Sequence, residues 1–295
     1  MTQPIELTET SIKKILTRAE HGFLRNKQGR AAVSSHSLQP YCGCTFGNSL
    51  CGVGCYVQSN CNLTKGRAWG QFLEVRTNAA ESYLRHVESE RRWARKHRAQ
   101  FSIFCSSSTD PFLPQEFRFG ITRSLLEAML VSPPDRLILQ THTHLVTRYM
   151  DLYAALRERC ELRFHISIET DREEMPGLPP HASPVARRLN ACDELRKAGH
   201  FAAVIVAPLL PIDEPERFFQ RIGQVADAVV IDHYIFGDGT NDGHRTARTE
   251  LPKAMAAVLP ESIALSYRSK MVDIARRQLP GRVGVSADGF AGFYE

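Results

Sequence analysis

Residues 40–58 read PYCGCTFGNSLCGVGCYVQ, and this stretch carries the pattern that decides the fold. Three of its cysteines, Cys44, Cys51 and Cys55, follow the spacing C-x6-C-x3-C among glycines. Thiolates this close together can surround one metal centre, because glycine lets the backbone fold over the ligands. An iron–sulfur cube held by only three thiolates keeps one iron open to a substrate or cofactor. The stretch therefore predicts redox chemistry rather than a structural metal site.

Two other uses of the cysteines fit the pattern less well. The chain has 8 cysteines, five of them between Cys42 and Cys61, and the N-terminal residues MTQPIELTETSIKK lack the apolar core of a secretion signal. Clustered cysteines in a chain of this length without an export signal argue against a disulfide framework. Structural zinc usually takes four ligands, often in two C-x-x-C pairs, and residues 40–58 contain no such pair. Zinc stays open as the alternative to an iron–sulfur cluster.

Length and composition set the class of protein. The 295 residues suit one α/β barrel of roughly 200–400 residues. Hydrophobic residues make up 43% and charged residues 23%, and the formal net charge of +5 permits a polyanionic partner without requiring one. No apolar run approaches the roughly 18 residues of a membrane span. We therefore expect a soluble, cytoplasmic protein with no membrane segment.

Strand-like and helix-like segments alternate after the cysteine loop, which is typical of a parallel sheet with helical crossovers. The fold class is predicted as α/β, a partial (β/α)6 barrel of TIM type over residues 31–235. An N-terminal extension (1–30) precedes this barrel, and C-terminal helices with a closing strand (236–295) follow it. The expected strands are 32–38, 101–105, 136–140, 162–168, 202–207 and 228–232, and the expected helices are 116–130, 148–159, 183–198, 214–225 and 264–279.

Polar clusters follow these strands, at the edge where parallel sheets carry their active sites. We expect the polar segment 237–250 to act as a movable lid, and His233 and Tyr234 to be candidate substrate contacts. The basic run Arg91–Arg98 is interpreted as a solvated helix face, with phosphate binding as its alternative. The polar clusters are 106–110, 141–144, 167–170, 207–208 and 232–234.

Taken in order along the chain, these motifs resemble those of the radical S-adenosylmethionine (SAM) enzymes, and in detail their spore photoproduct lyase-like branch. The resemblance runs from about residue 33 to about residue 235. The usual family spacing is C-x3-C-x2-C, and the longer loop here is similar to a subgroup with an insertion. The matching segments are Pro40-Tyr41-x-Gly43-Cys44, Cys55-Tyr56-Val57-Gln58, Ser108-Thr109-Asp110-Pro111, Ser167-Ile168 and Val206-Ala207-Pro208.

The resemblance implies a cofactor and a reaction. Cys44, Cys51 and Cys55 would hold a [4Fe–4S] cluster, with Cys42 and Cys61 as substitute ligands. SAM would chelate the open iron, and reduction by a flavodoxin-type or ferredoxin-type donor would give a 5′-deoxyadenosyl radical that abstracts hydrogen from the substrate. The fold would be the partial barrel of the radical SAM type.

The resemblance also assigns cofactor contacts to residues at the strand ends. Tyr56 would pack near the adenine, and Ala207 would contact the adenine through its backbone. His142 stands at the position of a lysine that contacts the cofactor carboxylate, and a histidine there can also donate. The remaining predicted cofactor contacts are Ser108, Asp110 (which could instead cap the next helix), Ser167 and Glu169, the last on the ribose hydroxyls.

Cys105 is the candidate catalytic residue, because the related lyases return hydrogen to their product from a cysteine after the second strand. Alignment on Asp110 instead places Ser107 at the donor position, and a buried core cysteine is the other interpretation of Cys105.

Three functional hypotheses remain open. The first in rank is a radical enzyme acting on a small molecule, peptide or protein side chain. The second is repair of a damaged nucleobase, which would make nucleic acid a partner. The third is a non-enzymatic iron–sulfur or zinc protein.

Overall fold

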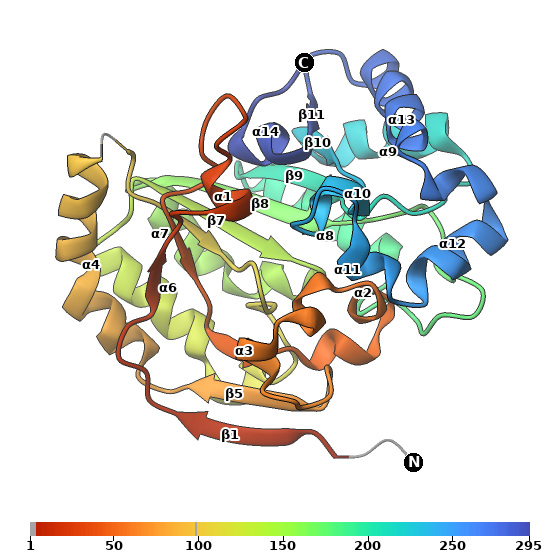
Figure 1. Cartoon of the computed structure of the whole chain (residues 1–295). Coiled ribbons are helices and arrows are strands. Elements are labelled where there is room, and N and C mark those ends of the chain that lie inside the picture. Colours follow the sequence, from red (N-terminus) through yellow and green to blue (C-terminus); the bar gives the residue numbers. More distant parts are fainter. Residues whose placement is uncertain (1–3, 98) are drawn as a thin grey trace.

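The protein is built around an eight-stranded sheet (Figure 1). The structure is a computed structural model that describes residues 4–97 and 99–295. Its strand order is β11-β10-β9-β8-β7-β6-β3-β2, and every neighbouring pair is parallel except the antiparallel pair β2–β3. The strands are β2 (Leu16–Arg18), β3 (His36–Leu38), β6 (Ser102–Cys105), β7 (Arg136–Thr141), β8 (Glu161–Ser167), β9 (Phe201–Val206), β10 (Ala228–Ile231) and β11 (Val283–Val285).

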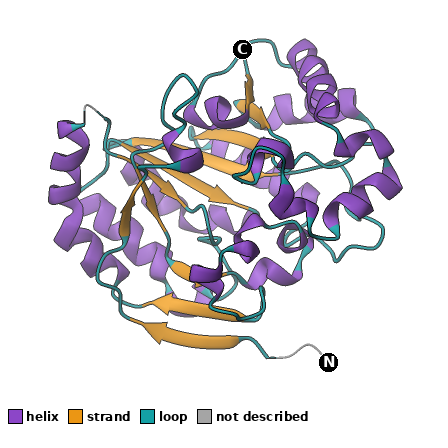
Figure 2. Ribbon diagram, in the orientation of Figure 1, coloured by secondary structure: helices purple, strands orange, loops and turns teal. Residues whose placement is uncertain are grey.

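Helices connect the strands and cover one face of the sheet (Figure 2). Residues such as Ile103, Leu137 and Phe164 pack there against the helices in the main hydrophobic core. The opposite face has a smaller core that includes Phe104, and Phe290 belongs to the same cluster. The connecting elements are α5 (Glu116–Phe119), α6 (Ile121–Val131), η3 (His144–Tyr149), α7 (Met150–Arg157), α8 (Val185–Lys197), α9 (Pro215–Val225), α10 (Tyr234–Gly237), α11 (His244–Ala247), α12 (Leu251–Val258), η4 (Pro260–Ile263) and α13 (Leu265–Gln278), with α14 (Ser286–Ala291) after β11.

The α/β class with a parallel sheet is confirmed. Each of the six expected strands overlaps an observed strand, and β11 pairs in parallel with β10 as the closing strand. The expected helix 116–130 is wrong in one respect, because Gly120 adopts a left-handed conformation with φ of 60° and divides it into α5 and α6. Within the described residues β2 and β11 form the edges of the sheet, so its closure into a partial barrel stays a prediction.

The cysteine loop lies in the long connection between β3 and β6. A second, three-stranded sheet of order β1-β5-β4 supports it, with β1 and β5 parallel and β4 and β5 antiparallel. Neither this sheet nor β2 was expected from the sequence. The elements of this part are β1 (Glu6–Thr10), α1 (Gly22–Arg25), β4 (Tyr41–Gly43), η1 (Thr45–Asn48), α2 (Leu50–Val53), η2 (Tyr56–Ser59), α3 (Cys61–Thr64), β5 (Phe72–Arg76) and α4 (Ala79–Lys96).

Helix α4 carries most of the basic run that the sequence singles out. Arg91 donates to the hydroxyl of Ser132 at 3.0 Å, while Arg92 and Arg95 are exposed. Arg98 lies outside the described residues. The Glu90 carboxylate on the same helix accepts hydrogen bonds from Lys14 and Arg18, and so ties the N-terminal segment to α4. In the part of the chain that the structure describes, no helix has both the length and the apolar character needed to cross a membrane.

A buried carboxylate anchors the start of the cysteine loop. Glu116 accepts hydrogen bonds from the hydroxyls of Tyr41 and Tyr149 and from the backbone N–H groups of Thr122 and Arg123. It is 3% exposed, so these four donors replace the water that it loses. Tyr41 in β4 is thereby fixed to the α5–α6 junction.

We predict that Glu116→Gln lowers the free energy of unfolding by about 1–3 kcal/mol, because an amide N–H would face buried donors. Urea unfolding measures this change. The matched control is Glu127→Gln, which removes only an exposed pair with Arg123 and should cost less than about 0.5 kcal/mol. Equal stability of the two variants would contradict the anchoring role.

Candidate functional site

A cavity of about 500 Å³ opens at the carboxyl ends of the strands. It is enclosed by the cysteine loop, by the residues that follow β6, β7, β9 and β10, and by the C-terminal segment from α10 to α11. Among the residues predicted to hold the cluster or the cofactor, eight line it: Cys44, Cys51, Cys55, Tyr56, Ser108, Asp110, His142 and Ala207.

The three cysteines of the predicted cluster face this cavity together. Cys44 is buried, whereas Cys51 and Cys55 are partly exposed. Burial raises the pKa of all three thiols, that of Cys55 to about 11, and their mutual repulsion as thiolates raises the pKa of Cys44 and Cys51 further. A bound metal would offset this cost, because it displaces the thiol protons.

The three thiols are therefore ligands of the type that an iron–sulfur cluster takes, and they line one cavity. Within residues 4–97 and 99–295, however, no three His, Cys, Asp or Glu side chains gather closely enough to hold a metal ion. The ligand set stays a prediction.

Glycines are required in the loop because the backbone packs on itself. A Cβ at Gly52 would lie 2.3 Å from the carbonyl oxygen of Gly47, and a Cβ at Gly54 would lie 2.2 Å from a methyl of Leu251. The second contact brings α12 against the cysteine loop. A side chain at position 52 would clash with the backbone of Gly47 and displace the loop, whereas one at position 54 would displace the Leu251 side chain.

The two substitute ligands lie elsewhere. Cys42 is in β4 beside Glu74, and burial raises the pKa of its thiol. Cys61 begins α3 and is exposed; it lines an adjoining hollow rather than the cavity.

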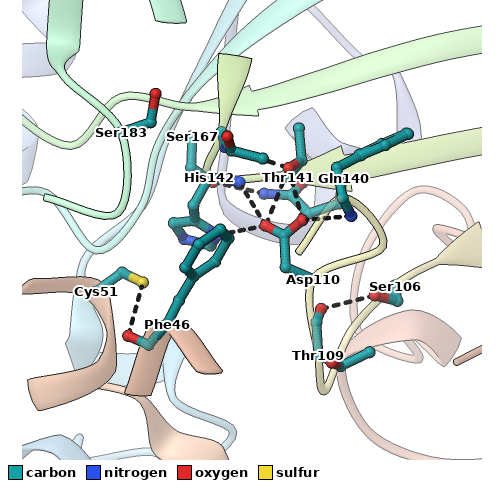
Figure 3. A network of polar contacts seen from close by, with 12 residues as sticks. Phe46, Cys51, Ser106, Thr109, Asp110, Gln140, Thr141, His142, Ser167 and Ser183 are labelled. Carbon is teal, nitrogen blue, oxygen red and sulfur yellow. Dashed lines mark hydrogen bonds and ion pairs between the residues drawn. The ribbon is translucent and has the colours of Figure 1, made fainter. Parts of the chain in front are cut away.

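Asp110 connects the ends of two neighbouring strands (Figure 3). Its carboxylate accepts from the Thr141 hydroxyl at 2.8 Å, from the backbone N–H of His142 at 2.8 Å and from that of Phe112 at 2.8 Å. The cap of the following helix α5 is Gln115, so helix capping by Asp110 is not what the structure shows. The carboxylate instead fixes His142 at the cavity wall.

His142 lies between two carboxylates. Its Nδ1 is 3.8 Å from Asp110 and its Nε2 is 3.5 Å from Oε1 of Glu169. Glu169 is 1% exposed and pairs with the buried Arg188 at 2.8 Å, but its Oε1 accepts no hydrogen bond from any residue that the structure describes. Burial alone would raise the pKa of Glu169, yet Arg188, His142 and His181 outweigh burial and lower it to about 2.

Ser167 and Tyr56, which were also predicted to contact the cofactor, are held by hydrogen bonds to neighbouring segments. Ser167 is fully buried behind Gln140, whose amide donates to its hydroxyl at 2.7 Å, and Gln140 itself lines the cavity. Tyr56 donates from its hydroxyl to the carbonyl of Ser107 at 2.8 Å. Ser167 and Glu169 thus stand behind the wall rather than in it.

Cys105 does not lie in the cavity wall as the structure describes it. It is 3% exposed and packs in the main core, on the face of β6 opposite to Phe104, which does line the cavity. This placement agrees with the interpretation of Cys105 as a core residue. Ser107, the competing donor position, lines the cavity.

Several cavity residues had no individual role in the sequence analysis: Asp232 stood only in the polar cluster 232–234, and Asp238 and Arg245 only in the expected lid. Asp232 contributes a carboxylate held by Ser286 at 2.7 Å and Arg268 at 3.3 Å, and burial raises its pKa. The expected lid, 237–250, forms a wall of the cavity through Gly237, Asp238, Gly239, Arg245 and Thr246. His233 and Tyr234 also line it, as expected for substrate contacts.

Comparison with solved structures shows which fold this is. A variant of spore photoproduct lyase with bound AdoMet and dinucleoside spore photoproduct matches with a TM-score of 0.58 and 14% identity, covering 95% of this chain and 81% of that one. A second variant, with the dinucleoside photoproduct, gives 0.58 and 16%, and a third gives 0.59 and 15%, at the same coverage. The chain has the fold of spore photoproduct lyase, and the structural relationship predicted from its motifs is confirmed.

Sequence comparisons add less. The chain is 30% identical over 146 residues to an uncharacterised protein, ORF301, of Acidianus two-tailed virus; the match covers 49% of this chain and 44% of that protein. This chain thus matches less than half the length of the viral protein. A scan against models of protein families found no match.

The cysteines that line the cavity are the ones that we expect to bind the iron–sulfur cluster. After anaerobic reconstitution, Cys44→Ala, Cys51→Ala and Cys55→Ala should each lose the visible absorbance of an iron–sulfur cluster, because a cluster with three protein ligands has none to spare. Cys42→Ala and Cys105→Ala are the matched controls and should retain it. Loss of the cluster in Cys42→Ala, with retention in Cys44→Ala, would reverse the assignment.

Glu169 should make the stability of the fold depend on acid. Its pKa is lowered from 4.5 to about 2 in the folded chain, so its stabilisation is fully present above about pH 4.5 and is lost as the pH falls toward 2. Urea unfolding of the metal-free chain between pH 5 and pH 2 should show a shallower loss of stability in Glu169→Gln than in the wild type. The exposed Glu194→Gln should follow the wild type, and identical slopes for all three would refute the coupling.

Proposed function

We propose that this chain is a radical SAM enzyme, with a [4Fe–4S] cluster on Cys44, Cys51 and Cys55 and SAM in the adjoining cavity. The observation that carries the proposal is that these three thiols line one cavity together with polar groups from successive strand ends. The fold shared with spore photoproduct lyase supports it. We also propose that the parallel sheet acts as the partial barrel of that class.

The chain's own residues would bind and orient the cofactor. A cluster held by Cys44, Cys51 and Cys55 would supply the electron for reductive cleavage of SAM, and the chemistry gained would be hydrogen abstraction from the substrate. His142 offers an imidazole at the wall, fixed through Asp110, and Glu169 has a free carboxylate oxygen 3.5 Å from that imidazole. Tyr56 and Ala207 would contact the adenine, with Ser108 beside them.

Apolar side chains on one side of the cavity would shelter the reaction from water. Phe104, Ile205 and Phe290 line the cavity as part of one apolar cluster and would keep water away from the reacting groups. Electrons would come from a flavodoxin-type or ferredoxin-type donor. We leave Cys105 out of the proposed chemistry because of its place in the core. The dinucleoside photoproduct is a ligand of two of the solved structures, and the substrate proposed here is a small molecule, a peptide or a protein side chain.

The proposal predicts SAM cleavage without added substrate. Anaerobically reconstituted protein with dithionite and SAM should form 5′-deoxyadenosine, measured by chromatography, whereas Cys51→Ala should form none above background. Cys105→Ala should form the wild-type amount. Absence of product from a wild type that binds roughly four irons per chain, as a full cube requires, would contradict the proposed function and favour a binding or electron-transfer protein.

A further inference from the structure

We propose that the substrate of this site carries a phosphate group, which Arg245 binds at the mouth of the cavity; this inference rests on the proposed function. Arg245 lines the main cavity and also a second hollow of about 420 Å³ beside it. The two spaces share Tyr56, Val57, Ser107 and Ser108 along with Arg245, so one ligand can extend from the first into the second.

The guanidinium of Arg245 has no counter-ion in the described part of the chain. No carboxylate there lies within the 4.0 Å of an ion pair, and its one hydrogen bond goes to the carbonyl of Asp238 at 3.2 Å. The Asp238 carboxylate is engaged elsewhere, by Thr240 and by the backbone N–H of Thr246 at 2.9 Å. Asp242 pairs with His244 at 2.8 Å. A half-buried guanidinium in this state retains donors for an anion.

The hollow beside Arg245 is rich in donors, and none of the described residues that line it is acidic. Ser107 accepts from Gln39 at 2.9 Å, which leaves its hydroxyl hydrogen for a ligand. The side-chain oxygen of Asn60 accepts from the first N–H groups of α3, so the amide nitrogen is the free end. The remaining lining residues are Tyr56, Val57, Ser59, Cys61 and Ser108. Several neutral donors around one guanidinium fit the several oxygens of a phosphate.

The position of Arg245 is fixed rather than free. Its neighbour Thr246 is 2% exposed, and the Thr246 hydroxyl donates to the carbonyl of Gly54 in the cysteine loop at 3.3 Å. The guanidinium rests against Gly239, where a Cβ would lie 3.0 Å from its nitrogen. Because the segment is tied to the cysteine loop, a phosphate bound by Arg245 would hold the rest of the substrate over the cavity.

Binding of small probes to the reconstituted protein tests the proposal. Calorimetry should show that thymidine 5′-monophosphate and glycerol 3-phosphate bind the wild type, and that thymidine binds at least tenfold more weakly than its monophosphate. Arg245→Gln should lose about 10–100-fold in affinity for both phosphates, as expected for charge-assisted hydrogen bonds. Arg248→Gln is the matched control, since Arg248 is exposed on the same helix end outside both cavities, and it should bind as the wild type does.

The two phosphates distinguish a nucleotide from a simpler phosphorylated substrate, and binding of either one through Arg245 supports the site. Equal affinity of thymidine and its monophosphate, or unchanged phosphate binding in Arg245→Gln, would overturn it. So would a loss of SAM binding in Arg245→Gln with phosphate binding intact, because Arg245 would then serve the cofactor. Formation of 5′-deoxyadenosine by the wild type is measured separately, so the proposed function and this inference can fail independently.

Discussion

The arrangement of the site depends on the carboxylate of Asp110, which joins the end of β6 to the end of β7. A carboxylate that is 3% exposed is stable only when donors surround it, and three come from Phe112, Thr141 and His142. Two of these are backbone N–H groups, so the bonds set the path of the chain itself. His142 is consequently held where its ring meets Glu169, and the polar groups of successive strands face one cavity in a fixed order.

The wall opposite these strands comes from distant parts of the chain. Leu251 in α12 packs on Gly54, and Thr246 bonds to the same residue, so the C-terminal segment covers the cysteine loop (Figure 1). Leu50, Tyr234 and Met255 belong to the small core beneath this contact. A glycine at position 54 therefore leaves room for Leu251 of the covering helix to approach the loop. The cysteine loop and the C-terminal segment together therefore form this side of the cavity.

Apolar periodicity predicted the parallel strands, because strands buried on both faces appear as continuous apolar runs. It could not predict β1, whose residues ELTET are mostly exposed, or the face to which a buried residue points. Phe104 and Cys105 look alike in such a run, yet one lines the cavity and the other enters the core. Arg245 was missed for a different reason: a cation in a polar segment has no pattern, and its role depends on which carboxylates the fold keeps away from it.

The long spacing of the cysteines is the feature that departs most from the resemblance, and the structure shows that the inserted residues are folded. The residues between Cys44 and Cys51 fold into η1 and the start of α2 rather than forming a slack loop. Gly47 N–H donates to the carbonyl of Cys44 at 3.0 Å, and the hydroxyl of Ser49 donates to that of Phe46 at 2.6 Å. These bonds turn the chain back on itself within the insertion. Cys51 therefore returns to the cavity that Cys44 also lines.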